Sequence, residues 1–353
     1  MFEGFANVWT PLVPARSLGK KPLALRLAGE PVVLFRDGRD GRDGQKRLGA
    51  LIDRCPHRGV ALSLGRVNKR GCLECPFHGW SFQTDGACAH IPLNEVPLEK
   101  RERYAATSLP VREVGGLIWV FTGSDSAGDE PELSEALIEP GWSRWIHDEV
   151  WSAHWTRAME NMLDMPHVPF VHRRTIGRGM RAQLRPDSVL RMRVEPEPYG
   201  ARFVGTLDGT EMEGGLRWRR PNGMELHIPI PGKKMRMHVF CVPIDAGHTR
   251  MIIIASRDFL RFGPIAWLSD QFNRYIVFED RAIVQSSQPP EVPPPGDELS
   301  TATDAPTLHF RRYYYRELRP SGGGALVPAE RLVAASRAVD APDSAEPLHT
   351  SES

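Results

Sequence analysis

Two short segments, Cys55-Pro-His57-Arg-Gly59 and Cys75-Pro-Phe-His78-Gly-Trp80, decide the fold that we expect for this chain. Each offers one thiol and one imidazole, in the order Cys-x-His and Cys-x-x-His. Facing loops of this kind would bring two cysteines and two histidines to one metal site. That set could hold a single tetrahedral zinc. It could equally hold a two-iron, two-sulfide cluster, with both cysteines on one iron and both histidines on the other.

The residues around these ligands favour the cluster over a zinc finger. Pro56 and Pro76 each follow a cysteine, and Gly59 and Gly79 each follow a histidine within two residues. This repeated layout predicts two similar loops, whereas a zinc finger would place both histidines on one helix. Over Cys55–Trp80 the chain resembles a Rieske iron–sulfur protein. Neutral imidazoles in place of two thiolates raise the potential relative to an all-cysteine cluster.

The remaining cysteines are interpreted as structural. Cys72, Cys88 and Cys241 are typical of small buried apolar residues, and His90 fits neither ligand pattern. Five cysteines is an odd number and too few for a disulfide scaffold, so we expect a reducing compartment and a cytoplasmic protein.

A second group of candidate ligands lies in the segment Glu160–His172. Asp164 and His167 are three residues apart, so one helical turn would place them on one face. His167 and His172 are five apart, and two intervening prolines would have to bring the second imidazole round. Two histidines and a carboxylate suit a mononuclear iron(II) that keeps open positions. The pattern alone is weak, because Asp164 could simply cap or buttress a helix.

Together the two groups give the chain a wider resemblance. From about Phe5 to Gln285 it resembles the α subunit of Rieske non-haem iron oxygenases. The resemblance implies that His167 and His172 hold the catalytic iron. It also implies that Asp164 bridges to a cluster histidine of the neighbouring subunit, in a head-to-tail homotrimer. Asn161 matches a position close to the iron.

The third iron ligand is expected on a helix over Pro264–Ser286. The resemblance implies that Asp280 is this ligand. Glu279 is adjacent but points about a quarter-turn away on a helix. Asp258 and Asp270 are weaker candidates. The apolar residues that follow one face of this helix are Leu268, Phe272, Ile276 and Ile283.

The expected architecture is α+β, in two domains. Short strands and turns predict a β-rich Rieske domain over residues 5–125, with a polar boundary at Thr122–Pro131. The resemblance implies a catalytic domain of the helix-grip type over residues 140–319, in which an antiparallel sheet from Ser188–Phe259 is closed by the long helix. Residues 320–353 are rich in Gly, Ala and Ser, which predicts a disordered tail. We expect the substrate pocket to be lined by Leu226, Ile228, Met237, Phe240 and Ile254.

The resemblance implies a terminal oxygenase. Electrons would come from NAD(P)H through a separate flavin-dependent reductase, with or without a ferredoxin. They would pass through the Rieske 2Fe–2S cluster to Fe(II), where O2 is the co-substrate. No Gly-x-Gly-x-x-Gly follows a strand, which agrees with a separate reductase. The expected reaction is monooxygenation, by hydroxylation or O/N-demethylation of a small, aromatic or secondary-metabolite substrate.

Three alternatives stay open from the sequence. The first is a cis-dihydroxylating aromatic-ring dioxygenase. The second is a non-catalytic Rieske electron carrier, in which Asp148–Gln285 is only a binding domain. The third is a zinc-binding interaction module.

Composition excludes other classes of partner. The chain has 353 residues, of which 41% are hydrophobic and 25% are charged, as in ordinary globular proteins. Lys and Arg total 45 against 44 Asp and Glu, so charge gives no reason to expect nucleic acid or an anionic membrane as partner. No aliphatic run approaches the ~20 residues of a membrane span. Met1–Lys21 lacks the pattern of a signal peptide.

Overall fold

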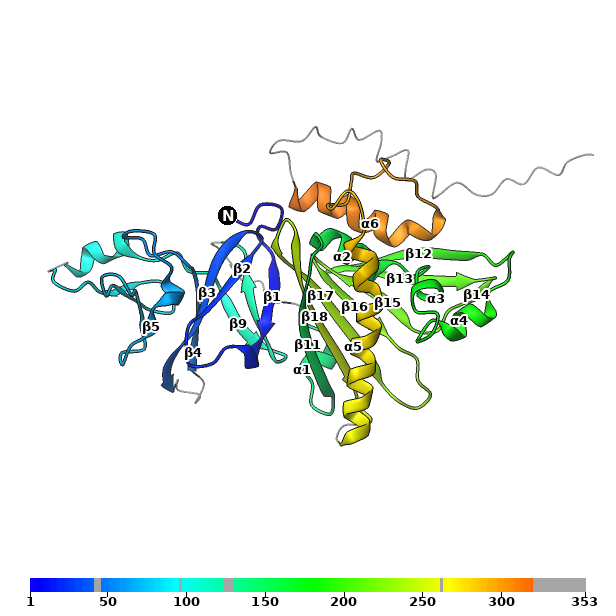
Figure 1. The fold of residues 1–353 in the computed structure, drawn as a ribbon, viewed down its shortest axis with the longest axis horizontal. Coiled ribbons are helices and arrows are strands. Elements are labelled where there is room, and N and C mark those ends of the chain that lie inside the picture. Colours follow the sequence, from blue (N-terminus) through cyan, green and yellow to red (C-terminus); the bar gives the residue numbers. More distant parts are fainter. Residues whose placement is uncertain (41–45, 95–96, 124–129, 132, 261–262, 320–353) are drawn as a thin grey trace, which may run out of the picture.

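The protein forms two regions side by side, a smaller one made of short strands and a larger one built on a single sheet (Figure 1). The computed structural model describes residues 1–40, 46–94, 97–123, 130–131, 133–260 and 263–319. The predicted tail at 320–353 lies outside these residues, as does most of the predicted boundary at Thr122–Pro131.

Three small antiparallel sheets make up the first region. One sheet contains β1 (Trp9–Pro14), β10 (Leu117–Phe121) and β9 (Val111–Val114). The next contains β2 (Leu23–Leu27), β3 (Glu30–Asp40) and β4 (Lys46–Ile52). The third contains β5 (Arg66–Val67), β6 (Leu73–Glu74), β7 (Ser81–Phe82) and β8 (Cys88–His90).

The second region is built on an antiparallel sheet in the order β11-β18-β17-β16-β15-β13-β12, with β14 paired to β13. Its strands are β11 (Ser143–Trp151), β12 (Leu190–Glu197), β13 (Gly200–Leu207), β14 (Thr210–Glu211), β15 (Gly215–Arg219), β16 (Gly223–His227), β17 (Met235–Asp245) and β18 (His248–Arg257). This α+β arrangement, with a β-rich first region, confirms the expected fold class.

Helices cover one face of this sheet. They are α2 (Trp155–Leu163), α3 (Val168–Val171), α4 (Arg178–Gln183), α5 (Pro264–Gln285) and α6 (Ala305–Tyr313). The short helix α1 (Glu135–Ile138) lies on the opposite face, where Glu135 pairs with Arg236. The long helix α5, predicted over Pro264–Ser286, lies across the sheet (Figure 1). An ion pair between Arg257 of β18 and Asp270 of α5, at 2.6 Å, fixes which face of the sheet the helix covers. None of the helices among the described residues is long and apolar enough to cross a membrane.

The two faces of the sheet correct the expected pocket lining. Side chains alternate along a strand, so Met237 lies on the α5 face, in register with Arg257 and its odd-numbered neighbours. Phe240 lies on the opposite face, where its ring packs edge-on against Trp119 of the first region at 5.3 Å. Ile254 shares that face. Phe240 and Ile254 were therefore wrongly expected in the pocket, because an odd spacing separates Met237 from Phe240.

The apolar stripe of α5 also differs from expectation. An amphipathic helix normally buries its apolar face. Here Leu268, Phe272 and Ile283 are about half exposed, and only Ile276 of the expected stripe is buried. The buried face is instead made of smaller and polar residues, namely Ala266, Asn273, Ile276, Val277, Asp280 and Val284. Polar side chains occupy this face because it borders the second candidate metal centre.

Candidate metal centres

The first centre lies between two loops of equal backbone design, which we call the cluster loops (residues 55–60 and 75–80). In the first, the amide of Gly59 donates to the carbonyl of Cys55 at 2.8 Å. In the second, the amide of Gly79 donates to the carbonyl of Cys75 at 3.1 Å. Both glycines have φ of +72°, a conformation that residues with a Cβ rarely adopt. The repeated layout in the sequence thus reflects two copies of one turn.

The cysteines of the cluster loops are buried together. Cys55 and Cys75 belong to a small hydrophobic core that is separate from the main one. Burial, with the neighbouring Cys75 thiol, raises the pKa of Cys55 to about 11. An isolated thiolate is therefore unfavourable here, whereas a metal would deprotonate the thiol outright. The thiol pair fits a metal-bound group better than it fits two ionised cysteines.

The histidines of the cluster loops lie against each other at the edge of this core. The rings of His57 and His78 are 4.7 Å apart. His57 also stacks on Trp80 at 4.6 Å, with only 3° between the ring planes, which fixes its orientation. Its Nδ1 is buried without a hydrogen-bond partner, as expected of an atom reserved for a metal. The four predicted residues thus form two thiols and two imidazoles at one place.

The histidine edge of this centre faces outward. His57 and His78 border an open pocket of about 430 Å³. Its rim carries Phe77, which is 60% exposed, and Leu93, which is fully exposed. Exposed apolar side chains around an open site mark surfaces where another protein docks.

The second centre begins with a very short helix. His167 immediately precedes α3 and His172 immediately follows it, so one helical turn separates the two imidazoles. Pro169 stands in the first turn of α3, where a proline is tolerated. The rings of His167 and His172 are 5.3 Å apart. The spacing of five, which a straight long helix would not align, is accommodated because the helix starts and stops between the two histidines.

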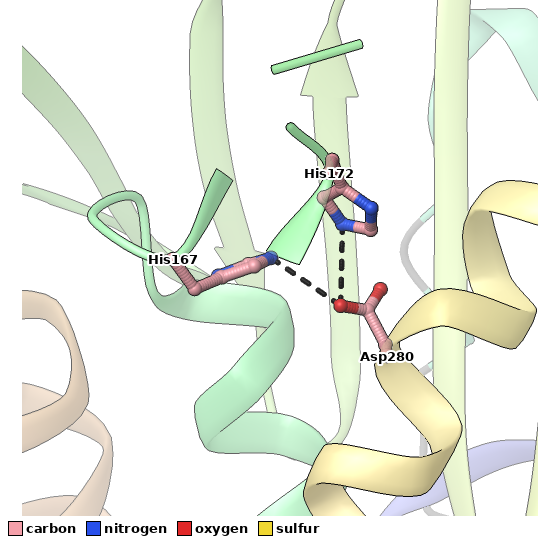
Figure 2. A group of neighbouring side chains, drawn as sticks. All are labelled: His167, His172 and Asp280. Atoms are coloured by element: carbon pink, nitrogen blue, oxygen red, sulfur yellow. Dashed lines mark ion pairs between the residues drawn. The ribbon is translucent and has the colours of Figure 1, made fainter. Parts of the chain in front are cut away.

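Asp280 of α5 completes what we call the ligand triad, His167, His172 and Asp280 (Figure 2). Its Oδ1 lies 3.5 Å from Nε2 of His167 and 3.2 Å from Nε2 of His172. One ligand atom from each residue lies within 4.8 Å of the others. Nitrogen and oxygen ligands bind such ions at about 2.1 Å, so donor atoms this close together could share one ion. Asp280 Oδ1 is buried and makes no hydrogen bond, which also fits a metal ligand.

Electrostatics distinguish the two histidines of the triad. Burial lowers the pKa of His167, which keeps its imidazole neutral, the form that binds metals. Burial opposes protonation of His172 as well, but the Asp280 and Glu279 carboxylates raise its pKa overall. Two histidines and one carboxylate are the ligand set of mononuclear iron(II) sites with open positions.

The two other predicted residues border the triad. Asp164 ends α2, and its Oδ2 lies 3.8 Å from Nδ1 of His167. Burial, followed by the charge of Asp304, raises the pKa of Asp164 to about 6. Asn161 lies in the last turn of α2, and its Nδ2 is buried without a hydrogen-bond partner. The structure therefore brings Asp164 to a triad histidine and leaves the side-chain nitrogen of Asn161 without a hydrogen-bond partner.

The weaker carboxylate candidates are engaged elsewhere. Asp270 pairs with Arg257, and Asp258 accepts a hydrogen bond from the amide of Lys234. Glu279 was expected to point a quarter-turn away from Asp280, and it does so. That direction brings its Oε2 to 3.0 Å from Nδ1 of His172, a contact that no sequence signal indicated.

The two centres lie far apart in one chain. The second cluster loop joins β6 to β7 in the sheet that contains β5, at one end of the molecule, whereas α5 lies in the other region (Figure 1). An electron path from a cluster to the triad would therefore either span both regions of one chain or cross to a neighbouring molecule.

Comparison with known proteins places both regions in families. Residues 8–102 match the Rieske [2Fe-2S] domain, and residues 151–318 match the vanillate O-demethylase oxygenase C-terminal domain. Chlorophyllide a oxygenase of Chlamydomonas reinhardtii is 32% identical over 303 residues, covering 79% of this chain and 41% of that protein. Methylxanthine N1-demethylase NdmA of Pseudomonas putida is 26% identical over 346 residues, 90% of each chain. The chain spans about half the length of the chlorophyllide a oxygenases that it matches.

Solved structures share the whole fold. NdmA of Pseudomonas putida superposes with a TM-score of 0.71 at 24% identity, over 96% of this chain and 98% of that one. Dicamba monooxygenase bound to 3,6-dichlorosalicylic acid gives 0.69 at 21% identity, over 89% and 97%. With a Rieske domain followed by an oxygenase domain, and with candidate ligands gathered in each, the chain belongs to the Rieske non-haem iron oxygenases.

Proposed function

We propose that this chain is the terminal component of an oxygenase system and that it carries out monooxygenation. The observation that carries the proposal is the convergence of His167, His172 and Asp280 from two distant segments. When bound, a Rieske cluster supplies single electrons and a mononuclear iron activates O2. A simple electron carrier would have no use for a second set of ligands, and a zinc module would not need two.

Each centre has its own residues in this proposal. Cys55, His57, Cys75 and His78 hold the cluster, and the triad holds the iron. Support comes from the buried thiol pair and from the unpartnered atoms His57 Nδ1 and Asp280 Oδ1.

Electrons would cross between subunits through Asp164. The two centres lie in different regions of one chain (Figure 1), and a neighbouring copy in a head-to-tail homotrimer would supply the shorter route. The apolar rim at Phe77 and Leu93 suits docking of that copy beside the cluster histidines. Asp164 contacts the triad through His167 and is one-third exposed, so it is open to a partner on its other side.

The substrate is proposed to be a small, mostly apolar organic molecule, aromatic or a secondary metabolite. Leu226, Ile228 and Met237 remain the pocket candidates, because they lie on the strands' α5 side. Demethylation is favoured because the relative that aligns over 346 residues is named a demethylase. The 3-chlorobenzoate-3,4-dioxygenase subunit of Comamonas testosteroni aligns over 181 residues only.

The remaining parts of the system follow from the same family. A separate flavin-dependent reductase, with or without a ferredoxin, would deliver electrons from NAD(P)H. We place the Rieske domain at residues 5–125 and the catalytic domain at 140–319. None of the five cysteines forms a disulfide, which supports a reducing, cytoplasmic location.

The function can be tested without the natural reductase. Protein loaded with cluster and Fe(II) is reduced with dithionite, freed of excess reductant, and mixed with ¹⁸O2 and a panel of methoxybenzoates and N-methylxanthines. We expect formaldehyde and a demethylated product for at least one compound, with Asp280→Asn inactive as control. Formation of cis-diols from unmethylated aromatics would contradict monooxygenation. Cluster oxidation with no product from any compound would contradict catalysis.

A further inference from the structure

We propose that Glu279 is a positioning residue that fixes the orientation and the tautomer of His172, and that Thr175 holds Glu279 in place. The inference rests on the proposed function, because it takes His172 as a ligand of the mononuclear metal. Glu279 lies beside Asp280 on α5, so one turn of a single helix would provide both a metal ligand and the support of another.

The contacts form a closed network around one oxygen atom. Nδ1 of His172 lies 3.0 Å from Oε2 of Glu279. The hydroxyl of Thr175 donates to that same oxygen at 2.6 Å. The amide of Thr175 donates to the carbonyl of His172 at 3.0 Å, which ties the hydroxyl to the histidine backbone. Only 2% of the His172 side chain and 14% of the Glu279 side chain are exposed, so water competes little for these bonds.

This network determines which nitrogen of His172 carries the proton. An ionised carboxylate only accepts hydrogen bonds, so Nδ1 must be the donor to Glu279. Nε2 is then left with its lone pair, and it is Nε2 that faces Asp280 at 3.2 Å. A carboxylate behind a ligating histidine fixes the ring and makes it a stronger ligand.

The same geometry separates the roles of the two neighbouring carboxylates. Asp280 Oδ1 lies near Nε2 of both triad histidines, whereas Glu279 Oε2 lies at Nδ1 of His172. Glu279 therefore supports a ligand from behind, and Asp280 is the one that faces the metal position.

His167 provides an internal comparison. Its Nδ1 is buried and makes no hydrogen bond, and the carboxylate of Asp164 is 3.8 Å away. Of the two imidazoles, only His172 is locked by a carboxylate. Loss of the Glu279 carboxylate should therefore weaken metal binding through His172 and leave the cluster loops unaffected.

The test measures Fe(II) binding rather than activity. Proteins with an intact cluster and an emptied second centre are dialysed anaerobically against known Fe(II) concentrations, and bound iron beyond the cluster is measured. Glu279→Leu removes the acceptor, whereas Glu279→Gln keeps an oxygen acceptor without the charge. Thr175→Val removes the supporting hydroxyl. Glu211→Gln, on an exposed strand, is the matched control.

We expect Glu279→Leu to weaken Fe(II) binding about 10- to 100-fold. Glu279→Gln should recover part of that loss, Thr175→Val should show a smaller loss, and Glu211→Gln should bind like the wild type. The visible spectrum of the cluster and the thermal unfolding of the metal-free protein should not change. A merely structural role would instead lower the unfolding temperature without a difference between Leu and Gln.

Wild-type affinity in both Glu279 variants would overturn the inference while leaving the proposed function intact. If Glu279→Leu does not fold, Glu279→Gln and Thr175→Val decide the matter by the same criterion. The His172→Ala variant distinguishes failure of this inference from failure of the proposed function. Should the wild type bind no more Fe(II) than His172→Ala, the proposed function fails, and this inference fails with it.

Discussion

The two candidate metal centres both use a pair of histidines, but they are assembled in opposite ways. The cluster loops lie close together in the sequence and repeat one turn, within a small core of their own. The ligand triad joins a single-turn helix to a long helix far downstream, and only the packing of α5 brings Asp280 to the histidines. A local motif can therefore specify the first centre, whereas the second exists only when the whole domain is folded.

The largest effects are expected from removing one ligand at each centre. Cys75→Ser should abolish the visible absorption of the cluster, because a buried hydroxyl does not replace a thiolate ligand. Asp280→Asn should keep that absorption and lower the iron content from about three to about two per chain. Iron and sulfide analysis checks both variants. Loss of colour in Asp280→Asn would show that the centres are not independent.

Asp164→Asn tests the connection between the centres. It should retain the cluster and the mononuclear iron, while substrate-coupled O2 consumption falls about 10- to 100-fold. The loss follows because the variant removes the charged contact that borders His167. Asp187→Asn, at an exposed position, serves as the control. Normal turnover in Asp164→Asn would contradict the route between subunits.

Gly177 tests how the backbone holds the triad. A Cβ at this position would lie 2.0 Å from the carbonyl oxygen of Val168 in α3, so Gly177→Ala should cost about 2–3 kcal/mol of unfolding free energy. Gly177→Ala should also weaken Fe(II) binding, because the amide of Gly177 donates a hydrogen bond to the carbonyl of His172. Nothing lies within 4 Å of a Cβ at Gly179 in α4, so Gly179→Ala should be neutral or stabilising. Urea unfolding measures the stability of both variants. Equal unfolding free energies for Gly177→Ala and Gly179→Ala would contradict a special packing role for Gly177.

His238 tests the effect of burial on stability at a histidine that is not a candidate metal ligand. It is buried on the sheet face opposite α5, among Glu225, Arg219, His227 and Arg236, and burial lowers its pKa to about 4. His238 therefore binds a proton more tightly in the unfolded chain than in the folded one. Stability should fall by about 2 kcal/mol between pH 7 and pH 5 through this group.

His238→Gln should flatten that part of the pH profile without changing the iron content. Measurements above pH 5 avoid the protonation of Glu225, whose lowered pKa would add to the loss in stronger acid. An unchanged profile in His238→Gln would assign the acid sensitivity to other groups.

The sequence predicted the local parts of this molecule better than the assembled ones. The cluster loops and the long helix were predicted from residues close together in the sequence, and family resemblance added the architecture and Asp280. Phe240 and Ile254 were assigned to the wrong face because strand alternation was not followed strictly. The contact between Glu279 and His172 was missed because it depends on how α5 is rotated against α3, which no spacing within α5 specifies.

The central claim is that one chain carries two separate iron centres. It is tested most directly by Mössbauer spectroscopy of anaerobic protein reconstituted with ⁵⁷Fe. We predict that about two thirds of the iron gives the signals of a two-iron cluster and about one third gives those of high-spin ferrous iron. His172→Ala should lose only the ferrous signal. Iron found solely in the cluster, at every metal concentration tried, would contradict the account.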